Sequence, residues 1–517
     1  MNFYKKLAQH HRKLSKLSHL NAICSWDQAS MMPEGGNEAR SEALAELAVM
    51  QHELATAPHL KEWFERAETE QLDNEQRVSL KEMKREWQMN TLLPAELVEL
   101  QSLAGSKCEH AWRSQRHEND WHSFSKNLKE VVELSRQEAQ IRAEATGLSR
   151  YDALLDIYEP GMTTKQLDSI FNDVKSWLPS LIRQVQEKQA TEDVITPVGP
   201  FPIEQQKSLS LEVMSKLGFD FNHGRLDVSV HPFCGGVSTD VRITTRYDEA
   251  DFTSALLGVI HETGHARYEQ GLPAKWRGLP AGEARSMGIH ESQSLFFEMQ
   301  LSRSKAFLDI LAPLASDAFS RRDDAALTSE NLALFNTRVT PDYIRVDADE
   351  VTYPAHIILR YEIERDLVEG HIEVEDIPEL WDKKMTEYLG LTTRCNHTDG
   401  CMQDIHWTDG KRQMSTTHNY RNGCMQDIHW CAGDFGYFPS YTLGAMYAAQ
   451  FMAAMRKEMN VENLIRQRNL QPIFNWLHKH IWRKGSTVST DQLLIDATGE
   501  KLNPEYFKQH LINRYLK

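Results

Sequence analysis

Helical periodicity dominates the pattern of hydrophobic and polar positions along this chain. Apolar residues recur every three or four positions among strong helix formers. The pattern predicts helices over residues 37–68, 74–87, 94–116, 121–146, 163–187, 203–217, 353–369, 441–459 and 471–482. We therefore expect a mainly α protein.

Alternation typical of strands is rare and is clearest in two short runs. Residues 226–230 and 239–244 alternate apolar and polar side chains on either side of Cys234-Gly235-Gly236. Two such runs around a glycine turn predict a small β-hairpin or sheet. Because a helical segment follows closely, we expect the strands to lie beside that helix.

The helical segment after the strands has clear boundaries. Its apolar residues between Phe252 and Ile260 recur at helical spacing. Asp251 can cap its start, and Gly271 followed by Pro273 marks its end. We therefore expect one helix between these two signals.

This helix carries the pentapeptide His261-Glu262-Thr263-Gly264-His265. Histidines four residues apart lie on the same helical face, so both imidazoles can bind one metal ion. Glu262 can act as the general base on a water at that metal. An amphipathic helix with two surface histidines is the alternative that the pentapeptide alone leaves open.

A third metal ligand is expected on a second helix downstream. A short Gly/Pro-rich connection, residues 271–282, leads to a segment in which Glu291 opens an apolar helical run. Two histidines and one glutamate form a known ligand set of catalytic zinc sites. Glu283 and His290 compete with Glu291 for this role, or assist a ligand from behind.

Composition narrows the class of protein. A chain of 517 residues is too long for one core of typical size, so we expect two lobes or one large helical body. The net charge of −16, with no Lys/Arg cluster, argues against a nucleic-acid partner. Residues 1–20 lack the apolar stretch of a secretory signal, and no run reaches membrane-spanning length. Seven cysteines without disulfide-like spacing suit the cytoplasm.

One segment is duplicated in tandem within residues 400–430. Gly-Cys-Met-Gln-Asp-Ile-His-Trp occupies residues 400–407 and again residues 423–430. Two copies are too few for a stacked repeat fold, so a local duplication is the simplest account. A second zinc site is a weaker interpretation, resting on Cys395, His397, Cys401, His406, Cys424, His429 and Cys431.

Several ordered motifs together resemble the carboxypeptidase Taq family of metallocarboxypeptidases. They lie at residues 25–33, 231–233, 240–245, 261–265, 290–294, 344–349 and 426–441. The resemblance implies one mainly α metallocarboxypeptidase domain over residues 1–517, with two helical lobes around a deep central groove, commonly as a homodimer. It implies that single residues are released with broad specificity from peptides that have a free C-terminal carboxylate. The implied cofactor is Zn²⁺, with Co²⁺ as an alternative.

The matching motifs assign the chemistry to particular residues. The metal ligands would be His261, His265 and Glu291, and the catalytic base would be Glu262. Arg345 would bind the terminal carboxylate of the substrate, since a planar guanidinium contacts a carboxylate at two points. Without the resemblance, a structural ion pair of Arg345 with its acidic neighbours is a plain alternative.

Further residues in these motifs are expected to contact the substrate. His429 and Tyr437 would hold the scissile carbonyl or its oxyanion. Without the resemblance, His429 would be interpreted as a core histidine and Tyr437 as a core aromatic residue. His231 and Arg242 are additional candidates for substrate binding.

The duplication departs from the family pattern. Only the second copy continues into the segment Phe435-Gly436-Tyr437, and only the first follows directly from residues 388–391. About 23 residues must loop out, at little closure entropy. We expect His429 in the active site and His406 in an exposed loop. A zinc oligopeptidase or endopeptidase without a carboxylate anchor, or an inactive metal-binding relative, remains the alternative.

Overall fold

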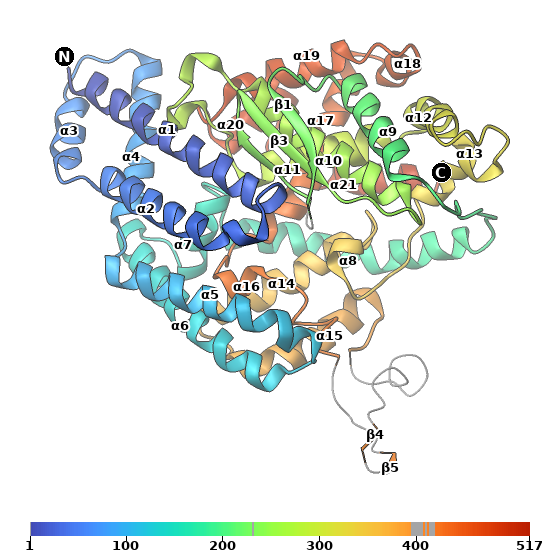
Figure 1. Cartoon of the computed structure of the whole chain (residues 1–517), viewed down its shortest axis with the longest axis horizontal. Coiled ribbons are helices and arrows are strands. Elements are labelled where there is room, and N and C mark those ends of the chain that lie inside the picture. The colour runs from blue at the N-terminus through green and yellow to red at the C-terminus, as the bar shows by residue number, and fades with distance from the viewer. Residues whose placement is uncertain (1, 230–231, 394–406, 409–410, 413–418) are drawn as a thin grey trace. The chain divides into compact units, whose positions relative to one another are not determined.

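The computed structural model describes residues 2–229, 232–393, 407–408, 411–412 and 419–517 (Figure 1). It is about 70% helical, and its described part contains 21 α-helices and one small three-stranded sheet. These observations confirm the mainly α class. Within the described residues, no helix combines the length and apolar character needed to cross a membrane.

The chain divides into two compact units. Unit 1 comprises Met1–Thr91, Glu192–Thr337 and Leu443–His510, and unit 2 comprises Leu92–Thr191, Arg338–Thr442 and Leu511–Lys517. Two helices, α17 (Pro439–Glu458) and α21 (Glu505–Tyr515), begin in one unit and end in the other.

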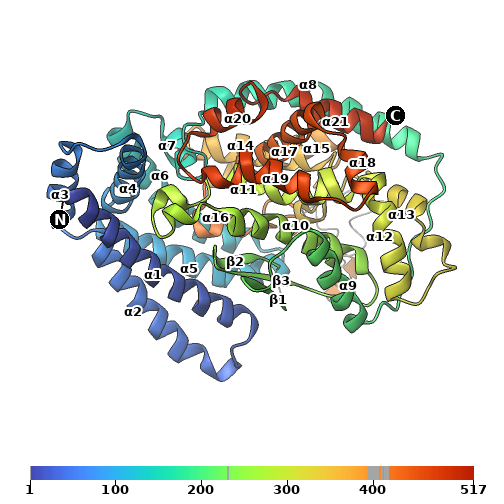
Figure 2. The same ribbon diagram turned by 90° about the horizontal axis from the view of Figure 1, so that it is seen from above.

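Unit 1 begins with a long helix and a second one that runs back along it (Figure 2). Its helices are α1 (Phe3–Ser30), α2 (Asn37–Ala55), α3 (His59–Glu68), α4 (Asn74–Thr91), α9 (Ile203–Lys216), α10 (Phe252–Gly271), α11 (Met287–Leu295), α12 (Lys305–Ala318), α13 (Ser329–Asn336), α18 (Val461–Arg466), α19 (Gln471–His480) and α20 (Thr490–Thr498). The helix expected over residues 37–68 is in fact two, α2 and α3. Pro58 directly precedes the second helix, and proline disfavours helical geometry in the residue before it.

The sheet of unit 1 has the order β1-β3-β2. Its strands are β1 (Gly224–Val228), β2 (Cys234–Val237) and β3 (Asp240–Thr245). The hairpin joins β2 to β3, whereas β1 pairs with β3 in parallel. The small sheet was predicted correctly, but the two alternating runs are not the two arms of its hairpin.

The sheet packs against α10, the helix with the H-E-x-x-H pentapeptide. Val241 and Ile243 of β3 share a buried cluster with Val259 and Ala266 of α10. Asp251 caps α10 as expected, because its carboxylate accepts hydrogen bonds from the backbone of Thr253 and Ser254. The helix that carries the candidate ligands is therefore fixed along one face.

Unit 2 is built around α14. Its helices are α5 (Ala95–His117), α6 (Trp121–Thr146), α7 (Arg150–Tyr158), α8 (Thr164–Gln189), α14 (Tyr353–Glu369), α15 (Ile377–Leu389) and α16 (His429–Ala432). Two short strands, β4 (Trp407–Thr408) and β5 (Lys411–Arg412), pair with each other.

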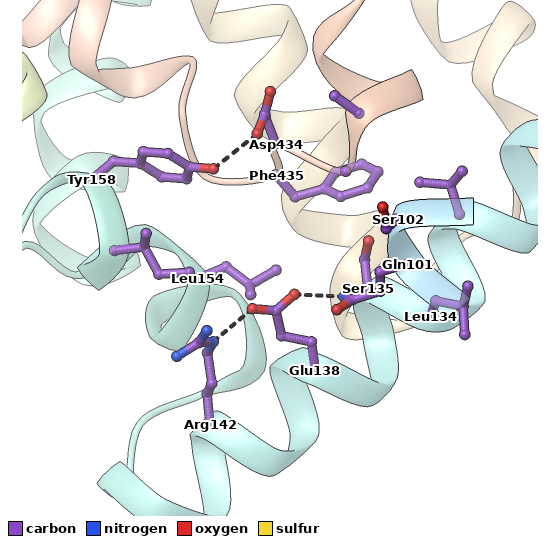
Figure 3. A pocket seen from close by; sticks show the side chains of 14 residues that line it. Gln101, Ser102, Leu134, Ser135, Glu138, Arg142, Leu154, Tyr158, Asp434 and Phe435 are labelled. Carbon is purple, nitrogen blue, oxygen red and sulfur yellow. Dashed lines mark hydrogen bonds and ion pairs between the residues drawn. The ribbon is translucent and has the colours of Figure 1, made fainter. Parts of the chain in front are cut away.

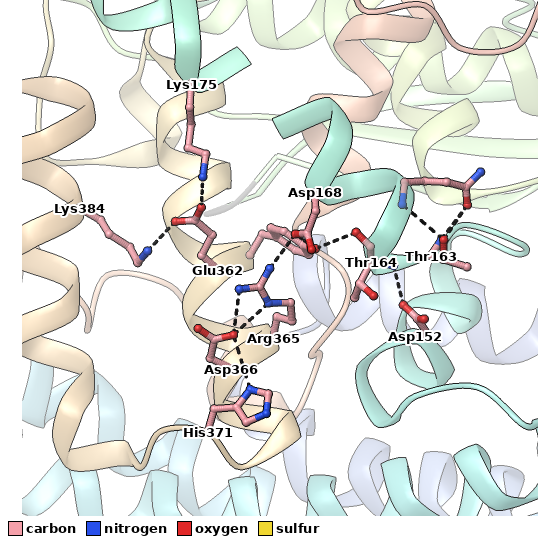
Figure 4. Close-up of polar contacts among 12 residues, drawn as sticks. Asp152, Thr163, Thr164, Asp168, Lys175, Glu362, Arg365, Asp366, His371 and Lys384 are labelled. Atoms are coloured by element: carbon pink, nitrogen blue, oxygen red, sulfur yellow. Dashed lines mark hydrogen bonds and ion pairs between the residues drawn. The ribbon is translucent and has the colours of Figure 1, made fainter. Parts of the chain in front are cut away.

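Ion pairs connect α14 to its neighbouring helices. Glu362 of α14 binds Lys175 of α8 and Lys384 of α15 (Figure 4). It also accepts a hydrogen bond from Tyr388 at 2.8 Å. Arg365 of α14 pairs with Asp168 of α8 at 2.6 Å. The polar face of α14 is thus neutralised by partners on two other helices.

Candidate active site

Two adjacent helices of unit 1 bring three potential metal ligands together. His261 and His265 project from α10, and Glu291 projects from α11. One ligand atom from each lies within 4.8 Å of those of the other two. The Nε2 atoms of His261 and His265 lie 3.9 and 3.4 Å from the carboxylate of Glu291. Two imidazoles and a carboxylate therefore face one point, as a single cation requires.

The other ring nitrogen of His261 is held from behind. Its Nδ1 lies 2.9 Å from Glu298, which also pairs with Arg303 at 2.8 Å. Glu298 belongs to the π-helical segment Phe296–Ser302 that follows α11. A carboxylate behind a histidine fixes the ring so that Nε2 is presented to the metal.

His265 is held by a relay of two residues. Its Nδ1 lies 2.6 Å from Nδ1 of His290, and Nε2 of His290 lies 2.9 Å from Glu269. His290, one of the competing ligand candidates, thus lies behind His265. Glu283, the other, is exposed and is not part of the cluster.

The two acidic side chains of this cluster differ in their pKa values. Burial raises the pKa of Glu262 to about 7. Burial alone would also raise the pKa of Glu291, but the charge of His261 and a hydrogen bond from His265 lower it to about 2. Glu291 is consequently an anion at neutral pH. A buried carboxylate between two imidazoles is the donor set that zinc and similar divalent ions prefer.

Two glycines allow the ligand helices to approach closely. A Cβ at Gly264 would lie 2.4 Å from the carbonyl oxygen of Gln293 in α11. A Cβ at Gly444 of α17 would lie 2.7 Å from Cβ and Cγ of Glu291. The position of Glu291 therefore depends on the absence of side chains at two sites far apart in sequence.

Unit 2 carries the candidate carboxylate anchor. Arg345 is 5% exposed and donates through Nε to Asp427 at 2.9 Å and through Nη1 to Tyr353 at 2.7 Å. Arg360 binds the other oxygen of Asp427 at 2.6 Å. The ion-pair partner of Arg345 is thus Asp427 and not the acidic residues next to it in sequence. Within the described residues, its third nitrogen, Nη2, has no hydrogen-bond acceptor.

His429 and Tyr437 lie side by side in unit 2. Their ring centroids are 5.5 Å apart, and Nε2 of His429 lies 3.2 Å from the hydroxyl of Tyr441. Burial lowers the pKa of His429 to about 4, so the imidazole is neutral at physiological pH. A neutral imidazole beside a phenol is a suitable hydrogen-bond donor for a polarised carbonyl oxygen.

Comparison with known proteins decides the family. The profile described as carboxypeptidase Taq (M32) metallopeptidase matches residues 6–412 and 414–515. The chain belongs to this family. Carboxypeptidase 1 of Bacillus subtilis is 36% identical, over 98% of this chain and 96% of its own length. Thermostable carboxypeptidase 1 of Thermus thermophilus is 34% identical, over 99% of this chain and 98% of its own length.

Solved structures agree with this family assignment. Trypanosoma cruzi metallocarboxypeptidase 1 superposes with a TM-score of 0.93 and 46% identity, covering 100% of this chain and 99% of that one. The M32 carboxypeptidase of Deinococcus radiodurans superposes with a TM-score of 0.90 and 30% identity, covering 99% of this chain and 98% of that one. The chain is therefore an M32 metallocarboxypeptidase, with peptides as substrates and a divalent metal as cofactor. The His261, His265 and Glu291 cluster fits such an ion.

The remaining predicted residues of this M32 enzyme fall in different places. Arg242 on β3 pairs with Asp240 through two nitrogens, at 3.0 and 2.8 Å. His231 lies outside the described residues, and so do residues 400–406 of the first repeat copy, which include His406. Cys424 and Cys431 of the weaker second zinc site are buried as free thiols.

The second repeat copy is built into unit 2. The carbonyl of Met425 accepts a hydrogen bond from Trp112 at 2.7 Å, and the side chain of Gln426 accepts one from the backbone of Arg345 at 2.7 Å. The backbone N–H of Asn419 donates to the carbonyl of Thr393 at 2.8 Å. The two ends of the intervening stretch are therefore adjacent, as expected of an inserted segment.

Sequence reasoning missed several residues that support the candidate site. Glu269, Glu298 and Gly444 gave no local signal, because each contacts its partner on another element, and Arg303 takes part only through Glu298. The H-E-x-x-H motif did contain Gly264, but only the close approach of α11 shows why glycine is needed there.

Proposed function

We propose that this chain is a zinc-dependent carboxypeptidase that releases single amino acids from peptide C-termini with broad specificity. The observation that carries the proposal is the convergence of His261, His265 and Glu291, each histidine being held through its other nitrogen. This donor set suits zinc, with cobalt as an alternative. When bound, the ion supplies Lewis-acid chemistry that polarises a carbonyl and acidifies water.

Glu262 is the general base in this proposal. Its carboxylate removes a proton from the attacking water and then delivers that proton to the leaving amine. Burial raises the pKa of Glu262, and a raised carboxyl pKa favours both proton transfers at neutral pH. No other residue needs to change protonation state for the bond to be broken.

The residues of unit 2 are proposed to recognise the substrate. Arg345 binds the terminal carboxylate, with Asp427 and Tyr353 holding two of its three nitrogens in place. His429 and Tyr437 donate hydrogen bonds to the carbonyl oxygen as it becomes negative. His231 and Arg242 are proposed as further substrate contacts. The homodimer and the cytoplasmic location remain predictions.

The test compares one peptide as a free acid and as its C-terminal amide. Mass spectrometry of the digest should show a ladder shortened from the C-terminus of the free acid and little cleavage of the amide. Arg345→Lys should lower kcat/KM on the free acid at least 10-fold, since lysine has one nitrogen and cannot keep the contacts to Asp427 and Tyr353 while it also binds the substrate carboxylate. Arg365→Lys, in an ion pair on α14, is the matched control and should leave kcat/KM unchanged.

The outcomes separate this proposal from its alternatives. Internal cleavage of both peptides would identify an endopeptidase or oligopeptidase. Bound zinc without any turnover would identify an inactive relative. Equal kcat/KM for Arg345→Lys and the wild type would move the carboxylate anchor to another residue, with Arg242 the next candidate.

A further inference from the structure

One carboxyl group in unit 2 contacts both ends of the segment His429–Tyr437. Glu364 lies on α14 with its side chain fully buried. Its Oε2 accepts a hydrogen bond from Nε1 of Trp430 at 3.1 Å, and its Oε1 accepts one from the backbone N–H of Gly436 at 3.3 Å. The hydroxyl of Tyr151, on α7, donates to Oε1 as well.

The two contacts adjoin the two candidate catalytic side chains. Trp430 follows His429, and Gly436 precedes Tyr437. Gly436 has a φ of +93°, and a Cβ there would lie 2.9 Å from the backbone nitrogen of Leu155. The segment therefore returns towards α14 in a conformation that favours glycine, and Glu364 receives it at both ends.

A cavity lies beside the middle of this segment. A cavity of about 340 Å³ borders it and is lined by Ala432, Gly433, Asp434 and Phe435 on one side and by α5, α6 and α7 on the other (Figure 3). The carboxylate of Asp434 accepts a hydrogen bond there from the hydroxyl of Tyr158 at 3.2 Å, and its backbone N–H donates to the carbonyl of His429 at 2.9 Å. Trp430, Cys431 and Phe435 are buried, but residues 432–435 border the cavity, so directional hydrogen bonds add to van der Waals contact in fixing the segment.

A buried carboxyl group is a costly way to fill a core position. An apolar side chain of similar size would usually be as stable or more stable. Burial raises the pKa of Glu364 to about 8, which reflects that cost. An apolar residue cannot accept hydrogen bonds, whereas the carboxyl group of Glu364 accepts from two donors six residues apart, Trp430 and Gly436.

We propose that Glu364 is a positioning residue that fixes His429 relative to Tyr437. This inference rests on the proposed roles of those two residues and deepens them. Glu364 contacts neither substrate nor metal in this scheme. It acts through Trp430 and Gly436, so its loss should lower kcat more than it raises KM.

The test uses Glu364→Gln, with Glu362→Gln as a matched control. Both glutamates lie on α14 and are buried, but Glu362 contacts Lys175, Lys384 and Tyr388 and not the segment. Glutamine replaces one acceptor of Glu364 with a donor, so at least one of the two segment contacts is lost. We expect kcat to fall about 10- to 100-fold, as for a small misplacement of catalytic groups, with KM changed less than about 3-fold.

Hydrogen exchange supplies a readout that does not depend on catalysis. Amides of residues 429–437 should exchange at least about 10-fold faster in Glu364→Gln, and at the wild-type rate in Glu362→Gln. Trp430→Phe removes one donor and leaves the carboxyl group in place. It should lower kcat in the same way, and adding Glu364→Gln should then cost little more, because coupled residues are not additive.

Two results would overturn the inference. One is a folded Glu364→Gln enzyme with wild-type exchange at residues 429–437, and the other is a kcat loss equal to that of Glu362→Gln. If Glu364→Gln does not fold, Trp430→Phe decides the matter by the same two measurements. His429→Ala with unchanged kcat/KM would instead refute the proposed role of His429, and the exchange rates would still decide whether Glu364 holds the segment.

Discussion

Replacing Gly264 with alanine should separate the two helices that carry the candidate metal ligands. The new Cβ would lie 2.4 Å from the carbonyl oxygen of Gln293 and 2.6 Å from Cα of Ser294. Comfortable contacts of this kind need about 3.5 Å. Both opposing atoms are backbone, so no side-chain rotation can relieve the clash. We therefore expect α10 and α11 to move apart by about 1 Å.

A displacement of this size exceeds what a metal site tolerates. Ligand distances in a working site vary by about 0.2 Å, and Glu291 would move with α11. We expect zinc to bind at least 10-fold more weakly in Gly264→Ala. The overpacking itself should also cost about 1–3 kcal/mol of stability.

Zinc affinity is measured by competition with a chromophoric chelator, and stability by thermal melting with an excess of chelator. Gly258→Ala is the matched control, because Gly258 lies on the same helix and a Cβ there meets no atom within 4 Å. That variant should bind zinc normally and gain up to about 1 kcal/mol from better helix propensity. Equal zinc affinity in the two variants would refute the argument that glycine sets the spacing of the ligands.

Three further predictions follow from other parts of the chain. Glu262→Gln should keep one bound zinc by metal analysis while kcat falls about 10²- to 10⁴-fold; near-normal turnover would exclude it as the base. Burial lowers the pKa of His356 to about 3, whereas an unfolded histidine titrates near 6.5. The free energy of unfolding therefore falls by about 1.4 kcal/mol per pH unit as the pH drops below about 6.5. The Tm of His356→Leu should consequently rise relative to that of the wild type when the pH is lowered from 7.5 to 5. A Tm difference that stays constant over this range would contradict the argument. Deleting residues 400–422, one repeat unit, should leave Tm and kcat/KM near the wild-type values, and loss of either would show that the inserted copy is required.

The helix that carries the two candidate histidine ligands could be predicted because its signals are local. The cap at Asp251, the histidines four residues apart and the stop at Gly271 all lie within one helix, α10. Glu291 was proposed from a short connection and an apolar run, with Glu283 and His290 left open beside it. The length of the first predicted helix was wrong although Pro58 marked the break, since helix formers on both sides outweighed it in the pattern.

What could not be predicted is set by contacts between distant residues. Nothing near Arg345 in sequence identifies Asp427 as its partner, and the acidic residues beside it suggested a different ion pair. The support of His261 by Glu298 depends on how the π-helical segment follows α11. The parallel pairing of β1 with β3 likewise depends on the path between two strands that each look like a hairpin arm.

The repeat shows how identical sequences can be told apart. Both copies have the same eight residues, so composition and periodicity cannot rank them. The short distance from Trp430 to Phe435 favoured the second copy, and the structure gives that copy buried partners: Asp427 joins Arg345 to Arg360, and Trp430 reaches Glu364. Asp427 of the second copy bridges two buried arginines, Arg345 and Arg360. The first copy could take its place only if the segment up to Tyr437 were also rebuilt. The connection to Tyr437, and not the motif itself, therefore determines which histidine is the candidate for catalysis.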